Sequence, residues 1–128
     1  DAYGWTSKAD IPEDSQYRFA AGLADEMVNA PVVILVYSNS TGVAASSTFP
    51  GVQNLLLSAR ALGLGTVLTT LHADVMEQVN TMFGVPSEMA FHCCIPVGYP
   101  RGNFGPTSRL PTSVTTSWDR WGNPPPWK

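Results

Sequence analysis

Charged residues are scarce in this chain, and several familiar chemical signatures are missing from it. Only 13% of its 128 residues are Asp, Glu, Lys or Arg, about half of the usual quarter. It has no apolar run long enough for a membrane-spanning helix, which takes about eighteen residues or more. It also lacks the broad basic stripe that tracks the phosphates of a nucleic acid. We therefore expect neither a membrane nor a nucleic acid as a partner.

Cysteine is also scarce. The chain has only two, Cys93 and Cys94, and they are adjacent in a predicted strand. Successive strand side chains point to opposite faces, so a disulfide between them would be strained. We predict two buried free thiols in a reducing compartment, the cytoplasm. The same alternation places His92 and Cys94 on one face. No further metal-binding pair accompanies them, so we predict no metal site.

The signatures of two common enzyme classes are also missing. The chain has no Gly-x-Ser-x-Gly turn, and its two histidines have no paired carboxylate pattern, so hydrolase chemistry has little support. Gly63-Leu64-Gly65 ends a predicted helix and precedes a strand, which is the reverse of a dinucleotide-binding turn. We predict no catalytic side chain.

What is present is a well-buried globular pattern, with 44% hydrophobic residues. Predicted helices and strands alternate from residue 13 to residue 97, which favours an α/β layered sandwich. Acidic residues should occupy the first turn of the first helix, and Val75, Met76, Val79 and Met82 should point inward from the last. The predicted helices span 13–30, a central segment ending at 63–65, and 73–83; the strands span 32–37, 66–70 and 90–97; the longest loop spans 38–50, with Ser46, Ser47 or Thr48 near the start of the central helix.

The central helix is apolar around most of its circumference. Val52, Leu55, Leu56, Ala59 and Leu62 recur at helical spacing, and three further apolar residues fill much of the remainder: Leu57, Ala61 and Leu64. Such a helix should be buried on more than one side. We expect the second covering surface to be another subunit.

The tail from residue 100 onward is rich in Pro, Gly, Ser and Thr and carries Trp118, Trp121 and Trp127. Three large aromatic side chains favour burial, so we expect the tail to wrap a neighbouring subunit or its own core. An alternative is a recognition segment for another protein. The tail is basic and the first thirty residues are acidic, which suits one small anionic ligand or, equally, two solvated ends of opposite sign.

Four motifs occur together in a fixed order in this chain. They are Gln53-Asn54-Leu55 leading to Gly63-Leu64-Gly65, then Phe83-Gly84-Val85-Pro86, then Gly98-Tyr99-Pro100, and then Ser108-Arg109-Leu110-Pro111. Over roughly residues 30 to 121, the chain thereby resembles the C-terminal half of the nitroreductase-like flavoproteins. The family's N-terminal, arginine-rich flavin-binding segment has no counterpart here.

The resemblance implies a mainly antiparallel sheet flanked by helices, an α+β layered sandwich, in a homodimer with flavin at the interface. The chain would then be a single partial domain with an irregular segment over 1–12, a core over 13–99 and an extended tail over 100–128. The implied activity is that of an FMN-dependent oxidoreductase. It would take hydride from NAD(P)H and reduce a nitro compound, a quinone or a similar acceptor.

The resemblance also implies which residues touch the cofactor. Leu68, Thr69, Thr70 and Leu71 occupy the segment whose backbone amide bonds the flavin N5, although an ordinary buried strand end is the alternative. Arg109 matches a basic residue that contacts the flavin phosphate. The missing arginine-rich segment, together with Thr107 at an often basic position, favours a second hypothesis. In it, the chain is a flavin-free relative that serves as a dimeric structural or interaction module.

His72 falls just past the predicted flavin-facing segment, at a position where family members often carry an aromatic residue near the substrate. It is therefore a candidate for contacting or gating a substrate. The alternative, which we prefer slightly, is a partly exposed histidine at the start of a helix.

Overall fold

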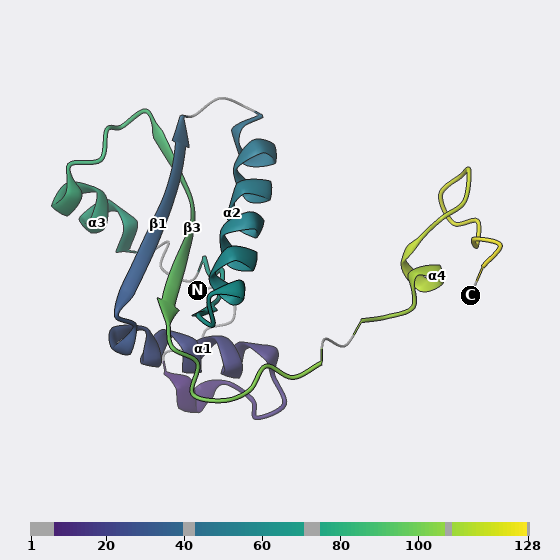
Figure 1. The fold of residues 1–128 in the computed structure, drawn as a ribbon, viewed down its shortest axis with the longest axis horizontal. Coiled ribbons are helices and arrows are strands. Elements are labelled where there is room, and N and C mark those ends of the chain that lie inside the picture. Colours follow the sequence, from purple (N-terminus) through teal and green to yellow (C-terminus); the bar gives the residue numbers. More distant parts are fainter. Residues whose placement is uncertain (1–6, 40–42, 71–74, 107–108, 128) are drawn as a thin grey trace.

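A three-stranded antiparallel sheet organises the chain in the computed structural model, which describes residues 7–39, 43–70, 75–106 and 109–127. β3 (Met89–Gly98) is the central strand, with β1 (Val32–Asn39) on one side and β2 (Gly65–Thr66) on the other (Figure 1). The helices are η1 (Lys8–Asp10), α1 (Gln16–Glu26), η2 (Met27–Asn29), α2 (Ala44–Ala61), α3 (Met76–Phe83) and α4 (Thr112–Thr115).

The sheet is covered by helices on both faces, which confirms the expected layered α+β arrangement. On one face, α2 runs alongside the strands, and on the other lies α3 (Figure 1). The core under α2 consists of Val52, Cys93 and Ile95, with partly buried apolar neighbours packed against it: Ile34, Val36, Leu55, Leu56 and Val97. Burial of this apolar surface is the main term that holds α2 to the sheet.

The predicted loop over 38–50 is wrong. β1 continues to Asn39, and α2 already begins at Ala44 with Pro50 inside it. Proline normally breaks a helix because it has no N–H to donate and its ring crowds the preceding turn. Here the apolar face of α2 packs on the sheet, and that packing outweighs the loss of one helical hydrogen bond.

The residues expected near the start of α2 do not cap it. Val43 is the N-cap and makes no side-chain cap bond, whereas Ser46, Ser47 and Thr48 lie within the helix. Thr48 Oγ1 instead donates to the Ala44 carbonyl at 2.8 Å, the local bond that a threonine makes inside a helix.

The first helix is shorter than predicted. α1 begins at Gln16, and Ser15 caps it by accepting a hydrogen bond of 3.3 Å from the Tyr17 N–H. No acidic residue occupies its first turn, because Glu13 and Asp14 lie in the turn before the helix. The expected acidic first turn is therefore wrong. The chain continues through η2 and leaves the helical region before Pro31, as predicted.

Both predicted glycine caps are confirmed. Gly63 follows α2 with φ +77° and Gly84 follows α3 with φ +61°, the left-handed conformation that glycine adopts without strain. The next residues complete the caps, since Leu64 N–H donates to Ala59 at 2.9 Å and Val85 N–H donates to the carbonyl of Asn80 at 2.9 Å.

The inward face predicted for α3 is only half right. Met76 is buried and Val79 is partly buried, but Met82 is 76% exposed and Val75 also remains exposed. The helix begins at Met76, three residues later than predicted. A helix of two turns can place only a narrow stripe on a sheet, so side chains at its two ends point to solvent.

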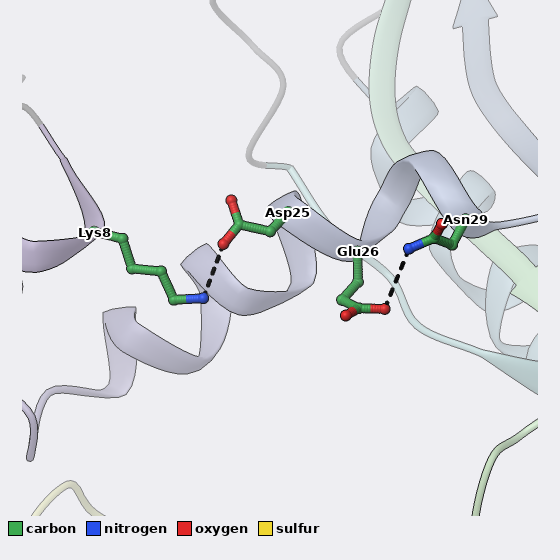
Figure 2. Close-up of polar contacts among 4 residues, drawn as sticks. All are labelled: Lys8, Asp25, Glu26 and Asn29. Carbon is green, nitrogen blue, oxygen red and sulfur yellow. Dashed lines mark hydrogen bonds and ion pairs between the residues drawn. The ribbon is translucent and has the colours of Figure 1, made fainter.

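Exposed ion pairs tie the first helices together. Figure 2 shows Lys8 of η1 reaching Asp25 of α1, with Nζ 2.8 Å from the carboxylate, and Asn29 donating to Glu26 at 3.4 Å. Arg101, just after β3, also pairs with Glu26 at 2.9 Å. All of these groups are exposed, so they orient the segments more than they stabilise them.

Apolar surface remains open on α2 and in the tail. Leu57 of α2 is 58% exposed, and Leu62, the residue that caps the end of this helix, is 78% exposed. The start of the tail contacts the core, since the Arg60 guanidinium carbon lies 3.7 Å from the centroid of the Phe104 ring. The segment containing α4 lies away from the sheet (Figure 1), so this segment does not wrap the chain's own core. Within it, Trp118 and Trp127 meet edge-on with ring centroids 5.3 Å apart, while Trp121 is 98% exposed.

In the described part of the chain, no helix combines the length and apolarity needed to cross a membrane.

Candidate functional site

The predicted cofactor segment lies along the β2 edge of the sheet and is interrupted there. β2 pairs with β3 through Gly65 and Thr66 only, and pairing resumes at an isolated bridge between Thr69 and Cys94. In the same register, Val67 falls opposite Pro96, which has no N–H to donate to it. The strand predicted over 66–70 is therefore split, because its partner strand lacks one ladder donor.

The bridge determines which amides of this edge are already engaged. Thr69 N–H donates to the Cys94 carbonyl at 2.9 Å, and Cys94 N–H donates back to Thr69 at 2.9 Å. Thr69 is only 5% exposed. Among the described residues, neither Leu68 nor Thr70 makes a backbone hydrogen bond, and both are exposed. The edge thus offers the amides of Leu68 and Thr70, not that of Thr69.

The remaining predicted site residues lie elsewhere. Leu71 and His72 fall outside the described residues, as does Thr107. Arg109 is exposed and opens the segment 109–127, which lies away from the sheet in Figure 1. Within one chain, the structure brings Leu68, Thr69 and Thr70 together and does not bring Arg109 to them.

A β-bulge in β3 alters the face on which His92 lies. Val36 pairs with Cys93 and Tyr37 pairs with Phe91, so the register skips His92. Cys93 joins the core under α2, and the His92 ring meets Phe49 of α2 edge-on at 5.8 Å. His92 and Cys93 therefore share the α2 side.

Cys94 lies on the opposite side of the sheet. There it lines an apolar hollow of about 280 Å³ together with residues of η2, β1 and α3: Met27, Val33, Leu35, Val75, Val79 and Phe83. The prediction that His92 and Cys94 share a face is wrong, because strict alternation assumes an unbroken ladder. In the described ranges, no group of three or more His, Cys, Asp or Glu side chains could hold a metal ion.

Both cysteines are buried free thiols, as predicted. Burial raises the pKa of the Cys93 thiol. Burial is also the larger cause that raises the pKa of the Cys94 thiol, and the charge of the neighbouring Cys93 thiolate is the smaller one. A raised pKa keeps both groups in the neutral, poorly nucleophilic form. Their role here is packing.

Two side-chain pairs across the sheet were not anticipated from the sequence. Ser38 Oγ lies 2.6 Å from Nε2 of His92, on the α2 side. The Tyr37 hydroxyl donates to Asn80 Oδ1 at 2.8 Å on the α3 side, and burial raises the pKa of Tyr37. The β-branched run over 32–37 predicted β1, but the partners of Ser38 and Tyr37 follow only from the bulge and from the placement of α3.

The fold and this edge define an α+β protein whose candidate site consists of backbone amides. The chain belongs to the nitroreductase family, whose model matches residues 2–99. A relative from Methanothermobacter thermautotrophicus, strain Delta H, carries the provisional name NADH dehydrogenase/NAD(P)H nitroreductase. It is 34% identical over 84 residues, which cover 60% of this chain and 44% of the relative.

Solved structures share the fold. Oxidized iodotyrosine deiodinase bound to FMN and 3-iodo-L-tyrosine superposes with a TM-score of 0.60 at 22% identity, covering 91% of this chain and 62% of that one. A protein from Bacteroides thetaiotaomicron, given the same provisional nitroreductase name, has a TM-score of 0.62 at 24% identity, with coverages of 78% and 67%. These matches confirm the nitroreductase-like fold. The chain spans about half the length of the curated relative that it matches.

Proposed function

We propose that this chain is part of an FMN-dependent oxidoreductase of the nitroreductase type. It would take hydride from NAD(P)H and pass electrons to a nitro compound, a quinone or a similar acceptor. Membership of the nitroreductase family and the name of the archaeal relative support this proposal. FMN in the solved deiodinase, which shares the fold, supports the choice of cofactor.

The interrupted pairing at the β2 edge is the observation that carries the proposal. Because Thr69 is committed to Cys94, the residues of this segment that fit a flavin ring are Leu68 and Thr70, whose amides remain available. Bound FMN would supply the hydride chemistry. The chain would supply an N–H donor beside N5, where negative charge develops on reduction. Leu71, the fourth residue of the segment, stays a candidate from the family resemblance.

A second copy of the chain would complete the site. Arg109 is the candidate phosphate ligand, yet it belongs to the segment 109–127, which lies away from the sheet of its own chain (Figure 1). The open apolar surface formed by Leu57 of α2 and by Leu62 at its C-terminal end suits the subunit interface of a homodimer. We propose one partial domain with its core over 13–99, acting in the reducing cytoplasm that two free thiols favour.

One observation favours the alternative of a flavin-free dimeric module. The segment that carries Arg109, the phosphate candidate, lies away from the sheet and its edge amides within one chain (Figure 1). In this second reading, α2 would still pair two chains, but the β2 edge would bind no cofactor.

A flavin titration distinguishes the FMN-dependent oxidoreductase from the flavin-free module. The purified chain is mixed with FMN, with riboflavin, which lacks the phosphate, or with neither, and its thermal unfolding is followed by circular dichroism. A ligand at 100 times its dissociation constant should add about 2.7 kcal/mol to the free energy of unfolding. If Arg109 binds the phosphate, FMN should stabilise the chain against thermal unfolding more than riboflavin does, and Arg109→Ala should remove that difference.

A colourless protein that remains dimeric and gains no thermal stability from either flavin would support the flavin-free module instead.

A further inference from the structure

Ser38 and His92 form a polar pair that the flavin proposal does not use. Ser38 Oγ and Nε2 of His92 are 2.6 Å apart, although the residues are 54 positions apart in the chain. We propose that they are a nucleophile and a general base that transfer an acyl group from small activated esters to Ser38. This activity would need neither flavin nor nicotinamide.

The first step of the argument concerns the hydroxyl proton. Ser38 has one proton and two acceptors within reach, the Asn39 carbonyl at 3.2 Å and His92 Nε2 at 2.6 Å. The 3.2 Å contact with the Asn39 carbonyl is longer than O–H···O hydrogen bonds usually are, so our proposal assigns the hydroxyl proton to the 2.6 Å contact with Nε2. His92 is then the tautomer with its proton on Nδ1. A serine hydroxyl bonded to neutral imidazole is the arrangement that activates a nucleophile.

The second step concerns how the imidazole is held. The β-bulge turns His92 to the α2 side, and Phe49 packs against the edge of its ring at 5.8 Å. Bulges are over-represented next to active sites, where they re-aim a side chain. Both Ser38 and His92 are only partly buried, so the pair is not sealed from solvent. The contacts of His92 within the described part of the chain are with Ser38 and Phe49 and not with a carboxylate, so we expect slow acyl transfer rather than rapid turnover.

The reaction balances without a redox partner. Ser38 Oγ forms a bond to the ester carbonyl carbon, and its proton moves to Nε2 of His92. The bond to the leaving alcohol or phenol then breaks, and the proton leaves with that group. In a second round, water attacks the acyl–Ser38 ester, its proton passes through His92 to Ser38, and a carboxylic acid is released.

The test uses p-nitrophenyl acetate on the full chain. We expect a burst of one p-nitrophenolate per chain, and an acetyl group on the peptide containing Ser38 when the acidified protein is digested and weighed. Ser38→Ala should abolish the burst. His92→Gln, which keeps a polar side chain but no base, should slow it about 100-fold. Ser58→Ala, on the exposed part of α2, should leave it unchanged. Added FMN should have no effect on the burst, which separates this test from the flavin titration.

Peptide mapping of the chain without substitutions, after its reaction with p-nitrophenyl acetate, keeps the test decisive even if a variant fails to fold. Acetyl on any residue other than Ser38, or no acetyl at all, would overturn the proposal. So would a burst of unchanged rate in folded His92→Gln.

Discussion

Thr69 and Cys94 exchange two backbone hydrogen bonds of 2.9 Å and thereby remove Thr69 from the set of available edge amides. One residue on either side, Leu68 and Thr70 have no such partner among the described residues. In an antiparallel ladder, alternate residues of an edge strand point their N–H groups away from the partner strand, and in this register those residues are Leu68 and Thr70. Pro96 removes only the donor that the Val67 carbonyl would otherwise accept from β3.

Replacing the Thr70 amide should weaken flavin binding. Thr70→Pro removes the N–H and should raise the dissociation constant of FMN roughly five-fold, since a hydrogen bond of this kind contributes about 1 kcal/mol. Thr70→Ala keeps the N–H and is the matched control. The affinity is measured by titrating FMN into each variant by calorimetry. Unchanged affinity in both Thr70→Pro and Leu68→Pro would contradict the assignment of this edge.

Two glycines of the α2 region should respond to alanine in opposite directions. Gly63 has φ +77°, so Gly63→Ala should lower the free energy of unfolding by about 1 kcal/mol, even though no atom lies within 4 Å of the added methyl group. Gly51 lies inside the helix with equally open surroundings. Gly51→Ala should therefore stabilise the protein by roughly 0.5–1 kcal/mol. Urea unfolding measures the free energy of unfolding of both variants. Changes of the same sign in the two variants would contradict the role of Gly63 as the left-handed residue that ends α2.

The bond between Tyr37 and Asn80 should hold α3 to the sheet. Tyr37→Phe deletes the hydroxyl and leaves Asn80 Oδ1 without its 2.8 Å donor, which should lower the free energy of unfolding by about 1 kcal/mol. Hydrogen exchange should show faster opening of α3 than of β1. Tyr99→Phe, at an exposed position, is the control. Equal rates of amide exchange in α3 of Tyr37→Phe and Tyr99→Phe would contradict the proposal that the Tyr37–Asn80 hydrogen bond holds α3 to the sheet.

Stability should fall in alkali because of the two thiols. Burial, and for Cys94 also the neighbouring Cys93, raises their pKa values above the ordinary 9.0. The unfolded chain therefore loses these protons at a lower pH than the folded chain does. Stability from this source is full below about pH 8 and declines as the pH rises through 9 and above.

Urea unfolding under reducing conditions at a series of pH values should show this decline, with a smaller one in a Cys93→Ala, Cys94→Ala double variant. Because burial also raises the pKa of Tyr37, both proteins are best compared in a Tyr37→Phe background. Parallel curves for the two proteins would exclude the thiols as the source.

Features determined by one or two neighbouring residues were predictable. Gly63 and Gly84 end their helices because left-handed backbone favours glycine wherever it occurs. The β-branched run over 32–37 likewise predicts a strand, and β1 forms there, although none of its residues is fully buried. The bulge at His92 was not predictable, because it is a mismatch in register with Val36 and Tyr37 in a distant strand. Pro50 within α2 was missed for a related reason, since the packing that keeps the helix intact comes from the sheet.

The candidate site was likewise predictable only in part. The segment Leu68 to Thr70 could be located from the Gly63-Leu64-Gly65 stop. Which of its amides are available could not be predicted, since that depends on the register that pairs Thr69 with Cys94. The pairing of Ser38 with His92 left no sequence signal, because it requires a residue at the end of one strand to meet a bulge in another.

The placement of the tail away from the sheet has a spectroscopic consequence. Three of the four tryptophans, Trp118, Trp121 and Trp127, belong to that tail. Indole fluorescence will therefore respond mainly to the loosening of the Trp118–Trp127 contact, whereas far-ultraviolet dichroism follows the helices. The two signals should trace separate transitions on denaturation, and their midpoints would report independently on each part of the chain.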